Sequence, residues 1–456
     1  MRFRHAVAGL AGLAVSLACA APAARAAETG VNETLAQSVP TVEKAPKLGA
    51  DWVRVWALWQ DLEPSPGGFN GHLVASMNHK IDALKARGIK VLVVVHRAPA
   101  WASGGGGIAP PDPAQFARFM GGIAQRIPGA DAWELWNEPD SGEFWAGAPQ
   151  PGAYAALVKA AYPAIKAVQP NDVVVLGGLV GNNMDFLAQL YAHGAQGSFD
   201  AVGVHTDTAC GIDHPGTYYR DERGRIGRYT FTGYREVHQV MADHGDGAKP
   251  IWMTEIGWNT QSTRKGSCSV GASAGKKPIG VTKQRQARFL RAAYRCIATD
   301  PFVGVAFWFG MQDIPRAMTR HARGFGLYGR KGKAKPAVKA FRRLDRGVSP
   351  RGCGGRVDRT PPTIQVREPD PDHRFRDKLS VRVRAFDNRG GSGIGRIMMA
   401  LDGKHIRSWG GSGGSIAPWW DSADWAPGMH TLTFRVRDFA QNETTLNVSV
   451  EKLRRR

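Results

Sequence analysis

Eight short apolar runs alternate with amphipathic segments between residues 28 and 345, and this alternation constrains the fold more than any other feature. It is typical of βα units that build a parallel sheet. Eight repeats over roughly 320 residues predict a (β/α)₈ TIM barrel of ordinary size. The predicted strands are 28–32, 52–56, 90–95, 132–136, 173–177, 200–204, 251–255 and 305–309. An open doubly wound sheet is the alternative, but the chain lacks a glycine fingerprint between a strand and a helix.

Helical periodicity separates these strands. The predicted helices are 71–87, 113–127, 152–168, 185–193, 233–244, 283–299 and 336–344. Asp112 and Pro113 predict an N-cap followed by proline at the first helical position. Gly88 and Gly245 are predicted C-caps, because glycine tolerates the left-handed backbone that ends many helices.

The pattern changes after residue 345. Residues 346–357 are rich in Gly, Pro and Arg and predict a linker. Alternating runs of the antiparallel type follow, and they predict a small all-β sandwich over residues 358–453. The runs are TIQV, LSVRVRAF, IMMAL, HTLTFRVRD and TLNVSV, and Asp402-Gly403 predicts a tight turn of the hairpin type.

Residues 1–27 predict a secretory signal peptide. Arg2 and Arg4 begin it, residues 6–20 are apolar, and residues 24–26 form a small-residue cleavage signal. The apolar stretch is too short for a membrane span, and no later segment has the length and apolarity of one. We therefore expect a secreted or cell-surface protein without stable membrane insertion.

Four cysteines follow the signal peptide, and an even number in an exported chain favours two disulfide bonds. Four cysteines allow three pairings. We favour Cys210 with Cys268, since both lie in loops on one face of the predicted barrel, and Cys296 with Cys353. None has the close spacing of a zinc site, so no metal is predicted there.

The chain is strongly basic. Its formal net charge is +21 at pH 7, of which three arginines of the signal peptide contribute three. Such a charge favours anionic partners, among them acidic glycans, although a solvated basic surface is the simpler interpretation. The basic residues are densest over 316–346, without the interleaved aromatic platform that single-stranded nucleic acid requires. Nucleic acid is therefore not an expected partner.

Two of the predicted strands end on a carboxylate. WELWNEPD (133–140) reaches Glu138 after the fourth strand, and IWMTEIGW (251–258) reaches Glu255 in the seventh. In a barrel of parallel strands these ends lie on the catalytic face. Retaining glycoside hydrolysis requires two such carboxyl groups, one to protonate the leaving oxygen and one to attack the anomeric carbon. The alternative for a single glutamate after a strand is a salt bridge in a loop.

WNEP after the fourth strand, together with TEIGW at the seventh, resembles glycoside hydrolase clan A and within it families 5 and 39. The resemblance covers about residues 28–345 and implies a retaining barrel enzyme without a cofactor. In the C-terminal part, PPTIQV, DNRGGSGI, LDG and RDFAQN resemble bacterial immunoglobulin-like modules. Such a module binds a surface or only spaces the enzyme from it.

The resemblance assigns roles to four residues of the barrel. Glu138 matches the general acid/base, Glu255 the nucleophile, and Arg54 the arginine beside the nucleophile. Asn137 matches the residue that hydrogen-bonds the sugar 2-hydroxyl. A purely structural role of Asn137 in the strand exit is the alternative.

Three further residues match positions around the sugar that is cleaved. His96 ends the third strand, His205 ends the sixth, and Trp308 matches the aromatic floor under the sugar ring. Structural hydrogen bonds for the histidines and core packing for Trp308 are the alternatives. No third ligand accompanies the histidines at metal spacing, so neither a metal nor another cofactor is predicted.

One position departs from the family pattern. Many relatives carry a tyrosine two residues after the sixth-strand histidine, where it hydrogen-bonds the nucleophile; this chain has Asp207. Tyr218 or Tyr219 of the following loop could replace it. Otherwise Asp207 near Glu255 would raise the pKa of one of the two carboxyl groups.

The sequence therefore predicts a secreted, monomeric, retaining glycoside hydrolase that cleaves β-glycosidic bonds of a polysaccharide or oligosaccharide. The alternatives are an inactive barrel that binds carbohydrate and a cell-envelope protein that binds an anionic polymer through residues 316–346.

Overall fold

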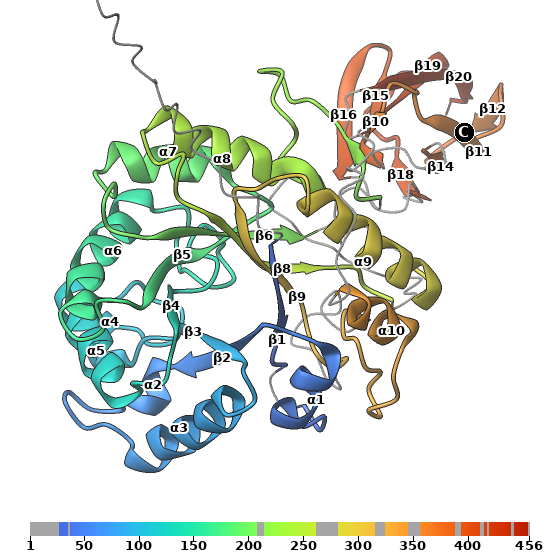
Figure 1. The fold of residues 1–456 in the computed structure, drawn as a ribbon. Coiled ribbons are helices and arrows are strands. Elements are labelled where there is room, and N and C mark those ends of the chain that lie inside the picture. Colours follow the sequence, from blue (N-terminus) through green and yellow to red (C-terminus); the bar gives the residue numbers. More distant parts are fainter. Residues whose placement is uncertain are drawn as a thin grey trace, which may run out of the picture.

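The computed structural model describes residues 27–34, 37–207, 214–260, 281–314, 324–344, 356–387, 394–410, 415–416, 419–438 and 442–454. Within these residues eight parallel strands close a barrel in the order β1-β2-β3-β4-β5-β6-β8-β9, which lies at the centre of Figure 1. The strands are β1 (Glu28–Asn32), β2 (Trp52–Leu58), β3 (Lys90–His96), β4 (Ala132–Leu135), β5 (Val173–Val180), β6 (Ala201–Asp207), β8 (Ile251–Gly257) and β9 (Val303–Trp308). The predicted barrel and its eight predicted strands are confirmed.

Helices surround the barrel (Figure 1). They are α1 (Thr41–Leu48), α2 (Trp59–Leu62), α3 (Gly71–Lys85), α4 (Ala100–Ser103), α5 (Pro113–Arg126), α6 (Pro151–Lys166), α7 (Met184–Ala192), η1 (Phe231–Gly233), α8 (Tyr234–Asp243), α9 (Lys283–Ile297) and α10 (Pro336–Arg342). The predicted start of α5 is confirmed, because the Asp112 side chain accepts a hydrogen bond from the backbone N–H of Gln115 at 2.9 Å.

The two predicted C-caps lie slightly beyond the helix ends. α3 ends at the cap residue Ala86 and α8 at His244. Gly88 and Gly245 follow these caps with φ values of 75° and 81°. Both glycines therefore serve the left-handed turn that leaves the helix rather than the cap itself.

The barrel interior is layered. An apolar layer fills it near the beginnings of the strands and consists of Trp52, Leu92, Ala132, Val175, Ala201, Trp252, Val305 and Phe307. Alternate residues of a strand face the same side, so Arg54 and Glu134 lie above Trp52 and Ala132 on the same inward face. Arg54 and Glu134 are both fully buried and form an ion pair of 2.6 Å. Charged side chains thus rest on a packed apolar floor, toward the carboxyl ends of the strands.

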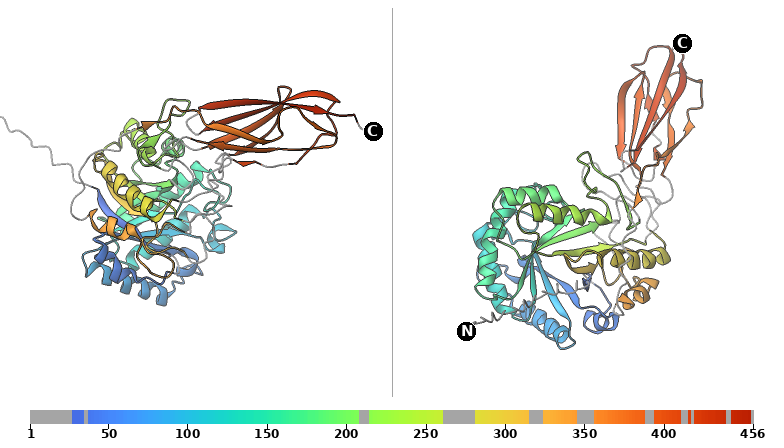
Figure 2. Two further views of the ribbon diagram at one scale, coloured as in Figure 1. Left: turned by 90° about the vertical axis from the view of Figure 1, so that its right-hand side faces the viewer. Right: turned by 45° about the horizontal axis from the view of Figure 1, so that its top comes forward.

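The C-terminal part is an all-β sandwich, as predicted. It contains β11 (Thr363–Glu368), β12 (His373–Phe375), β13 (Lys378–Ser380), β14 (Arg382–Phe386), β15 (Ile394–Leu401), β16 (Lys404–Gly410), β17 (Ser415–Ile416), β18 (Trp419–Asp421), β19 (Gly428–Asp438) and β20 (Glu443–Lys452). The sheets β12-β20-β19-β15-β16, β11-β14-β17 and β13-β18 share one apolar core. Figure 2 shows this part as an elongated body beside the barrel.

Two local features connect the sequence to this arrangement. Asp402 and Gly403 join β15 to β16 with φ values of 47° and 80°, so the predicted hairpin turn is confirmed. β7 (Thr217–Tyr218), in the connection between β6 and β8, pairs in parallel with β10 (Arg356–Val357). The segment that leads into the sandwich is therefore hydrogen-bonded to a loop of the barrel.

Several predictions lie outside the described residues. These include the signal peptide up to residue 26 and the positions of Cys210, Cys268 and Cys353. Cys296 lies near the end of α9 and is disulfide-bonded, while the pairings remain predictions. No helix in the described ranges is long and apolar enough to cross a bilayer.

Gly178 of β5 lies where the pairing of β5 with β6 shifts register, between Leu176 and Leu179. A Cβ atom at this position would come within 2.1 Å of His205 Nε2 and 2.7 Å of Thr254 Oγ1. Glycine at this position thus allows β5 to pass close to the side chains of β6 and β8.

Gly178→Ala should lower the free energy of unfolding of the barrel by about 1–3 kcal/mol, because an overpacked interior forces neighbours out of place. Urea unfolding followed by tryptophan fluorescence measures the change. Gly71→Ala is the control, since a Cβ at this first position of α3 meets open space. That variant should unfold at the wild-type midpoint or slightly above it. A wild-type unfolding midpoint for Gly178→Ala would contradict the close approach of β5 to the side chains of β6 and β8.

Candidate active site

A cavity of about 460 Å³ opens at the carboxyl ends of the barrel strands. Its lining includes predicted site residues from four strand ends, namely His96, Asn137, Glu138, His205 and Glu255. The structure therefore brings these residues together on the face where parallel barrels carry their active sites.

The backbone at this end of the barrel is unusual. Arg97, Trp136, Glu138 and Asn182 all have positive φ values, of 66°, 72°, 46° and 51°. Residues other than glycine rarely adopt this conformation, and they cluster at functional sites where surrounding contacts hold them in place. In the WNEP motif the left-handed turn carries Glu138 beyond the last paired residue of β4 and directs it into the cavity.

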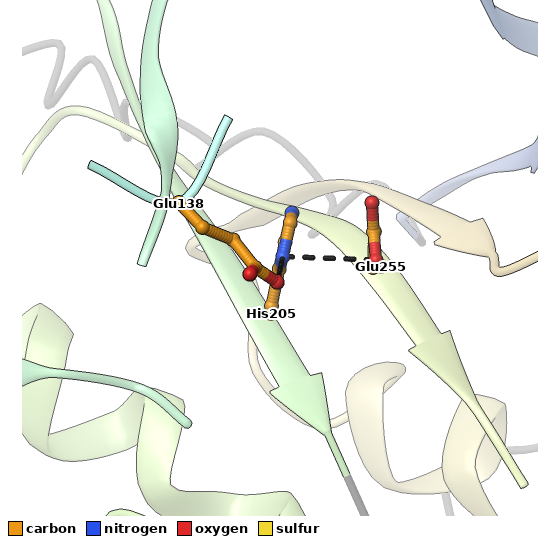
Figure 3. Close-up of side chains that lie close together, drawn as sticks. All are labelled: Glu138, His205 and Glu255. Carbon is orange, nitrogen blue, oxygen red and sulfur yellow. Dashed lines mark hydrogen bonds and ion pairs between the residues drawn. The ribbon is translucent and has the colours of Figure 1, made fainter. Parts of the chain in front are cut away.

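Glu138 and Glu255 lie close together with His205 between them (Figure 3). His205 Nδ1 is 2.8 Å from Glu138 Oε1 and 3.7 Å from Glu255 Oε2. One carboxylate oxygen of each glutamate and one ring nitrogen of the histidine all lie within 4.8 Å of one another. The predicted pair of carboxyl groups thus forms one cluster that can share protons.

Arg54 holds the polar side chains of the site together. Its Nη1 donates to Glu255 Oε1 at 2.8 Å, and its Nη2 donates to Asn137 Oδ1 at 2.8 Å. Its Nε donates to Glu134 Oε2 at 2.6 Å. Three hydrogen bonds from one fully buried guanidinium therefore fix the relative positions of side chains from β2, β4 and β8.

Glu134 is a functional candidate that the sequence reasoning missed. It is fully buried, and besides Arg54 it accepts a hydrogen bond from the backbone N–H of Gly178 at 3.0 Å. The available signal was an acidic residue on the inward face of a strand between Trp133 and Leu135. An ionised carboxylate in such a place requires a buried cationic partner, and the inward-facing arginine of β2 supplies it.

Burial controls the protonation of the cluster. It raises the pKa of Glu255 to about 7; His205 and Arg54 oppose this shift, whereas the charges of Glu138 and Glu134 add to it. Burial also lowers the pKa of His205. The cluster therefore keeps a proton on a carboxyl group up to nearly neutral pH, next to a histidine that tends to remain neutral.

His96 ends β3 and lines the cavity, with only 3% of its surface exposed. Neither of its ring nitrogens has a hydrogen-bond partner among the described residues. Burial and the nearby Arg97 lower its pKa to about 3, so the ring is neutral. A neutral imidazole offers one donor and one acceptor, which suits the hydroxyl groups of a sugar.

The position of Trp308 differs from the prediction. It is fully buried, its Nε1–H donates to the carbonyl of Phe325 at 3.0 Å, and it packs against Trp258. It is not among the described residues that line the cavity. Core packing is thus the role that its surroundings support, because β9 ends at Trp308 and the cavity begins one residue later. The aromatic lining residues are Trp56, Phe144, Phe309 and Phe325.

The expected replacement for the missing tyrosine is also absent from the described lining. Tyr219 is buried against Gly227, and neither it nor Tyr218 reaches the cavity. The side chain of Asp207 lies outside the described part of the chain. In the described part, Arg54 and His205 are the polar groups beside Glu255.

Glu138, His205 and Glu255 also have the donor atoms of a metal site. However, the Arg54 guanidinium lies 2.8 Å from Glu255 and places a permanent positive charge beside the cluster. That charge opposes a second cation and favours proton transfer as the chemistry of the cluster.

A second acidic cluster lies in the sandwich, where carboxylate oxygens of Asp358, Asp387 and Asp438 are within 4.8 Å of one another. Asn442 donates to Asp438 through its backbone and side-chain N–H groups, both at 2.8 Å. Burial raises the pKa of Asp438 to about 7. No predicted site residue belongs to this cluster.

Comparison with known protein families gives one match. Residues 25–206 match the family described as Cellulase (glycosyl hydrolase family 5), and this range includes β1 to β5 and all but the last residue of β6. No curated protein matches the chain.

Solved structures with a similar fold are glycoside hydrolases. A family 39 glycoside hydrolase from the gut symbiont Bacteroides cellulosilyticus WH2 has a TM-score of 0.56 at 18% identity, covering 87% of this chain and 79% of that chain. The GH5_18 protein from Streptomyces cattleya, solved with GlcNAc, has a TM-score of 0.52 at 18% identity, covering 72% and 83%. A GH5_18 protein from Bifidobacterium longum subsp. infantis has a TM-score of 0.50 at 15% identity, covering 77% and 82%.

A closed parallel barrel with a carboxylate cluster at its strand ends, together with the family match, defines the class of protein. The chain is a glycoside hydrolase of the clan A type. The resemblance to family 5 that WNEP and TEIGW indicated is confirmed by the match over residues 25–206, and a family 39 glycoside hydrolase has a similar fold.

Glu134→Gln should lower kcat by about 10²-fold with little change in KM, because small displacements of reacting groups have effects of that size. The substitution places an amide group opposite Arg54 and weakens the hold of Arg54 on Glu255. Steady-state kinetics on an aryl glycoside measures both constants. Asp243→Asn, at an exposed carboxylate at the end of α8, is the control and should keep wild-type kinetics. A folded Glu134→Gln enzyme with unchanged kcat would contradict a positioning role.

Proposed function

We propose that this protein hydrolyses β-glycosidic bonds with retention of configuration, with Glu255 as the nucleophile and Glu138 as the general acid/base. The separation of the two carboxyl groups carries the proposal. One oxygen of Glu138 lies within 4.8 Å of one oxygen of Glu255, a limit on the nearest approach that supports the shorter of the two separations found in glycosidases. Retaining enzymes place the two groups about 5–5.5 Å apart, whereas inverting enzymes leave about 6.5–9.5 Å for a water molecule.

In the first step, Glu138 gives its proton to the glycosidic oxygen while a carboxylate oxygen of Glu255 attacks the anomeric carbon. The bond from that carbon to the leaving oxygen breaks, and a glycosyl ester forms on Glu255. Asn137 supports this step, because its Oδ1 accepts a hydrogen bond from Arg54. This contact orients the amide and leaves its NH₂ group for the sugar 2-hydroxyl.

In the second step, Glu138 is a carboxylate and accepts a proton from water. The water oxygen attacks the anomeric carbon, the ester bond to Glu255 breaks, and the sugar leaves with its original configuration. His205 Nδ1 lies 2.8 Å from Glu138 and can hydrogen-bond either protonation state of that carboxyl group.

The catalytic cycle needs one proton on the carboxyl pair. Burial raises the pKa of Glu255 to about 7, so below neutral pH the free protein holds a proton on Glu255, and Glu255 can attack only once that proton is on Glu138 or lost. Because the two carboxyl groups and His205 are in contact, their protonation steps belong to the cluster rather than to one residue.

We also propose that the protein is exported after removal of residues 1–27 and that it acts as a monomer. In this proposal the barrel comprises residues 28–345, the linker residues 346–357 and the sandwich residues 358–453. The charged start, apolar stretch and small-residue cleavage signal support export. N-terminal sequencing of protein from the culture medium of an expressing bacterium would test it, with Ala27 or Glu28 expected as the first residue.

The substrate panel should be broad, since the identity of the sugar is open. It should contain β-glucans, β-xylans, β-mannans and aryl glycosides. β-Mannosides are included because a variant of the Streptomyces cattleya protein was solved with Manb1-4GlcNAc.

Glu255→Ala should abolish hydrolysis of every substrate that the wild type cleaves, because no ester intermediate can form. Azide should react differently with the two variants: the β-glycosyl azide is expected from Glu138→Ala, and the α-glycosyl azide from Glu255→Ala. Proton NMR of the first products reports both the azide configuration and retention by the wild type. Inverted wild-type products would contradict the mechanism. If the wild type hydrolyses no substrate of the panel but still binds a glycan, the barrel is a carbohydrate-binding domain without catalytic activity.

The value of kcat/KM should fall about tenfold per pH unit below pH 7, because Glu255 must be ionised to attack and its pKa is about 7. Glu138→Gln should move this limb to lower pH, because it removes a negative charge that raises the pKa of Glu255. A dinitrophenyl glycoside is the suitable substrate, since its leaving group needs no protonation. If the decline of kcat/KM at low pH stays at the same pH in Glu138→Gln, the ionisation that causes it belongs to a group other than Glu255.

A further inference from the structure

We propose that the cavity recognises a glycan bearing an anionic group, a carboxylate or a sulfate, and that Arg97 binds this group. The inference rests on the proposed function for cleavage of that glycan, whereas recognition of the anion can be measured by binding alone.

Arg97 follows His96 directly at the end of β3 and lines the same cavity as the carboxyl pair. Among the lysines and arginines that the structure describes, it alone belongs to this lining. Within the same described residues, no hydrogen bond or ion pair engages its guanidinium. The Nη1 atom of Arg97 lies 3.8 Å from where a Cβ atom of Gly107 would be, and the charge of Arg97 lowers the pKa of the cavity residue His96. Its planar group of five N–H donors has no protein acceptor among the described residues, which suits bidentate binding of an oxyanion.

The backbone holds Arg97 in this position at a cost. Its φ of 66° lies in the left-handed region, which is unfavourable for a residue other than glycine. Hydrogen bonds on both sides maintain it. The carbonyl of Arg97 accepts from the N–H of Gln60 at 2.9 Å, and Ala98 pairs with Gly107 through two bonds of 2.9 and 2.7 Å. Strain that is maintained at a cavity indicates a side chain placed for a ligand.

The neighbouring charges limit where the anion can bind. Glu138 and Glu255 would repel a negative group close to the bond that is cleaved. Glu33 and Glu143 also line the cavity and would repel an anion bound beside them; Glu33 is paired with Lys80 at 2.8 Å, and His96 is neutral. The anionic group therefore belongs near Arg97, on a ring position or a neighbouring sugar away from the reacting atoms.

The overall charge of the chain supports the same class of substrate from independent data. The formal net charge of +21, which becomes 21 − 3 = +18 once residues 1–27 are removed, attracts polyanions over long range and raises their rate of encounter. This general attraction does not select a binding mode. Arg97 would add the local contact that an otherwise solvated basic surface lacks.

Binding to matched polysaccharides tests the inference. The probes are glucuronoxylan, hyaluronan and gellan, each beside its carboxyl-reduced form, which keeps the linkages but removes the charge. A sulfated galactan and its desulfated form distinguish sulfate from carboxylate. Affinity electrophoresis at about 0.15 M salt limits long-range attraction to about 8 Å. All proteins are full chains that carry Glu255→Ala, so that no hydrolysis interferes. This variant is compared with the three double variants that add Arg97→Ala, Arg97→Lys or Lys331→Ala.

The Glu255→Ala protein should bind at least one charged probe about tenfold more tightly than its uncharged form, as expected for a charge-assisted bidentate contact. Arg97→Ala should abolish this preference, and Arg97→Lys should restore it in part, because lysine keeps the charge without the planar fork. Lys331→Ala removes one exposed charge outside the described lining and should keep the full preference.

Equal binding of charged and uncharged probes, or equal losses in Arg97→Ala and Lys331→Ala, would overturn the inference. Hydrolysis of an acidic glycan by Arg97→Ala at the wild-type kcat/KM would overturn it while keeping the glycosidase. Arg97-dependent binding of an acidic glycan by a protein whose wild type cleaves no substrate of the panel would have the opposite meaning. It would keep the anion site and overturn the proposed function.

Discussion

The buried guanidinium of Arg54 is the interaction on which the rest of the site depends. A charge removed from water is tolerated only if its hydrogen bonds are satisfied, and Arg54 satisfies three of its N–H groups on Glu134, Asn137 and Glu255. These partners come from β4, the turn after it and β8. Their strands must therefore hold the correct register for the charge to be compensated. Breaking such a pair typically costs about 3–5 kcal/mol, so the geometry of the site and the integrity of the barrel are coupled.

The two carboxyl groups of the cluster have different surroundings, and this difference allows one acid and one base to coexist. Glu255 contacts a permanent cation, whereas Glu138 contacts His205, whose pKa burial lowers. Arg54 therefore favours the ionised form of Glu255, while burial and the charge of Glu138 oppose it. A bound substrate whose glycosidic oxygen accepts a hydrogen bond from Glu138 keeps Glu138 protonated and uncharged. The ionised form of Glu255 is then favoured, because the negative charge of Glu138 no longer opposes it. Asymmetry of this kind is how a pair of identical side chains can take two roles.

Residues at strand ends were predictable from sequence because parallel strands deliver their ends to one face; hence Glu138, Glu255, Asn137 and both histidines were expected together. Arg54, the third residue of β2, was assigned to the site by the resemblance to the family. The position of Trp308 was not predictable, because a single residue decides between the core and the cavity at the end of β9, and periodicity does not locate strand ends that finely. Glu134 was missed because its role requires the register of β2 against β4. In the sandwich, LSVRVRAF was predicted as one strand, whereas β13 and β14 separate at Val381 and pair with different partners. β16 went unpredicted because KHIRSWG shows little alternation.

The site also separates catalysis from recognition in structural terms. The carboxyl pair is held through Arg54 by contacts inside the barrel, whereas Arg97 is held by backbone hydrogen bonds outside that network, to Gln60 and through Ala98. A change at Arg97 therefore leaves the Arg54 contacts in place, and a change at Glu134 leaves the backbone at Arg97 in place. Because the two sets share no hydrogen bond among the described residues, substitutions in them should act nearly independently on catalysis and on binding. Specificity in such a barrel can then vary at the strand exits while the buried charge network, which tolerates little change, is retained.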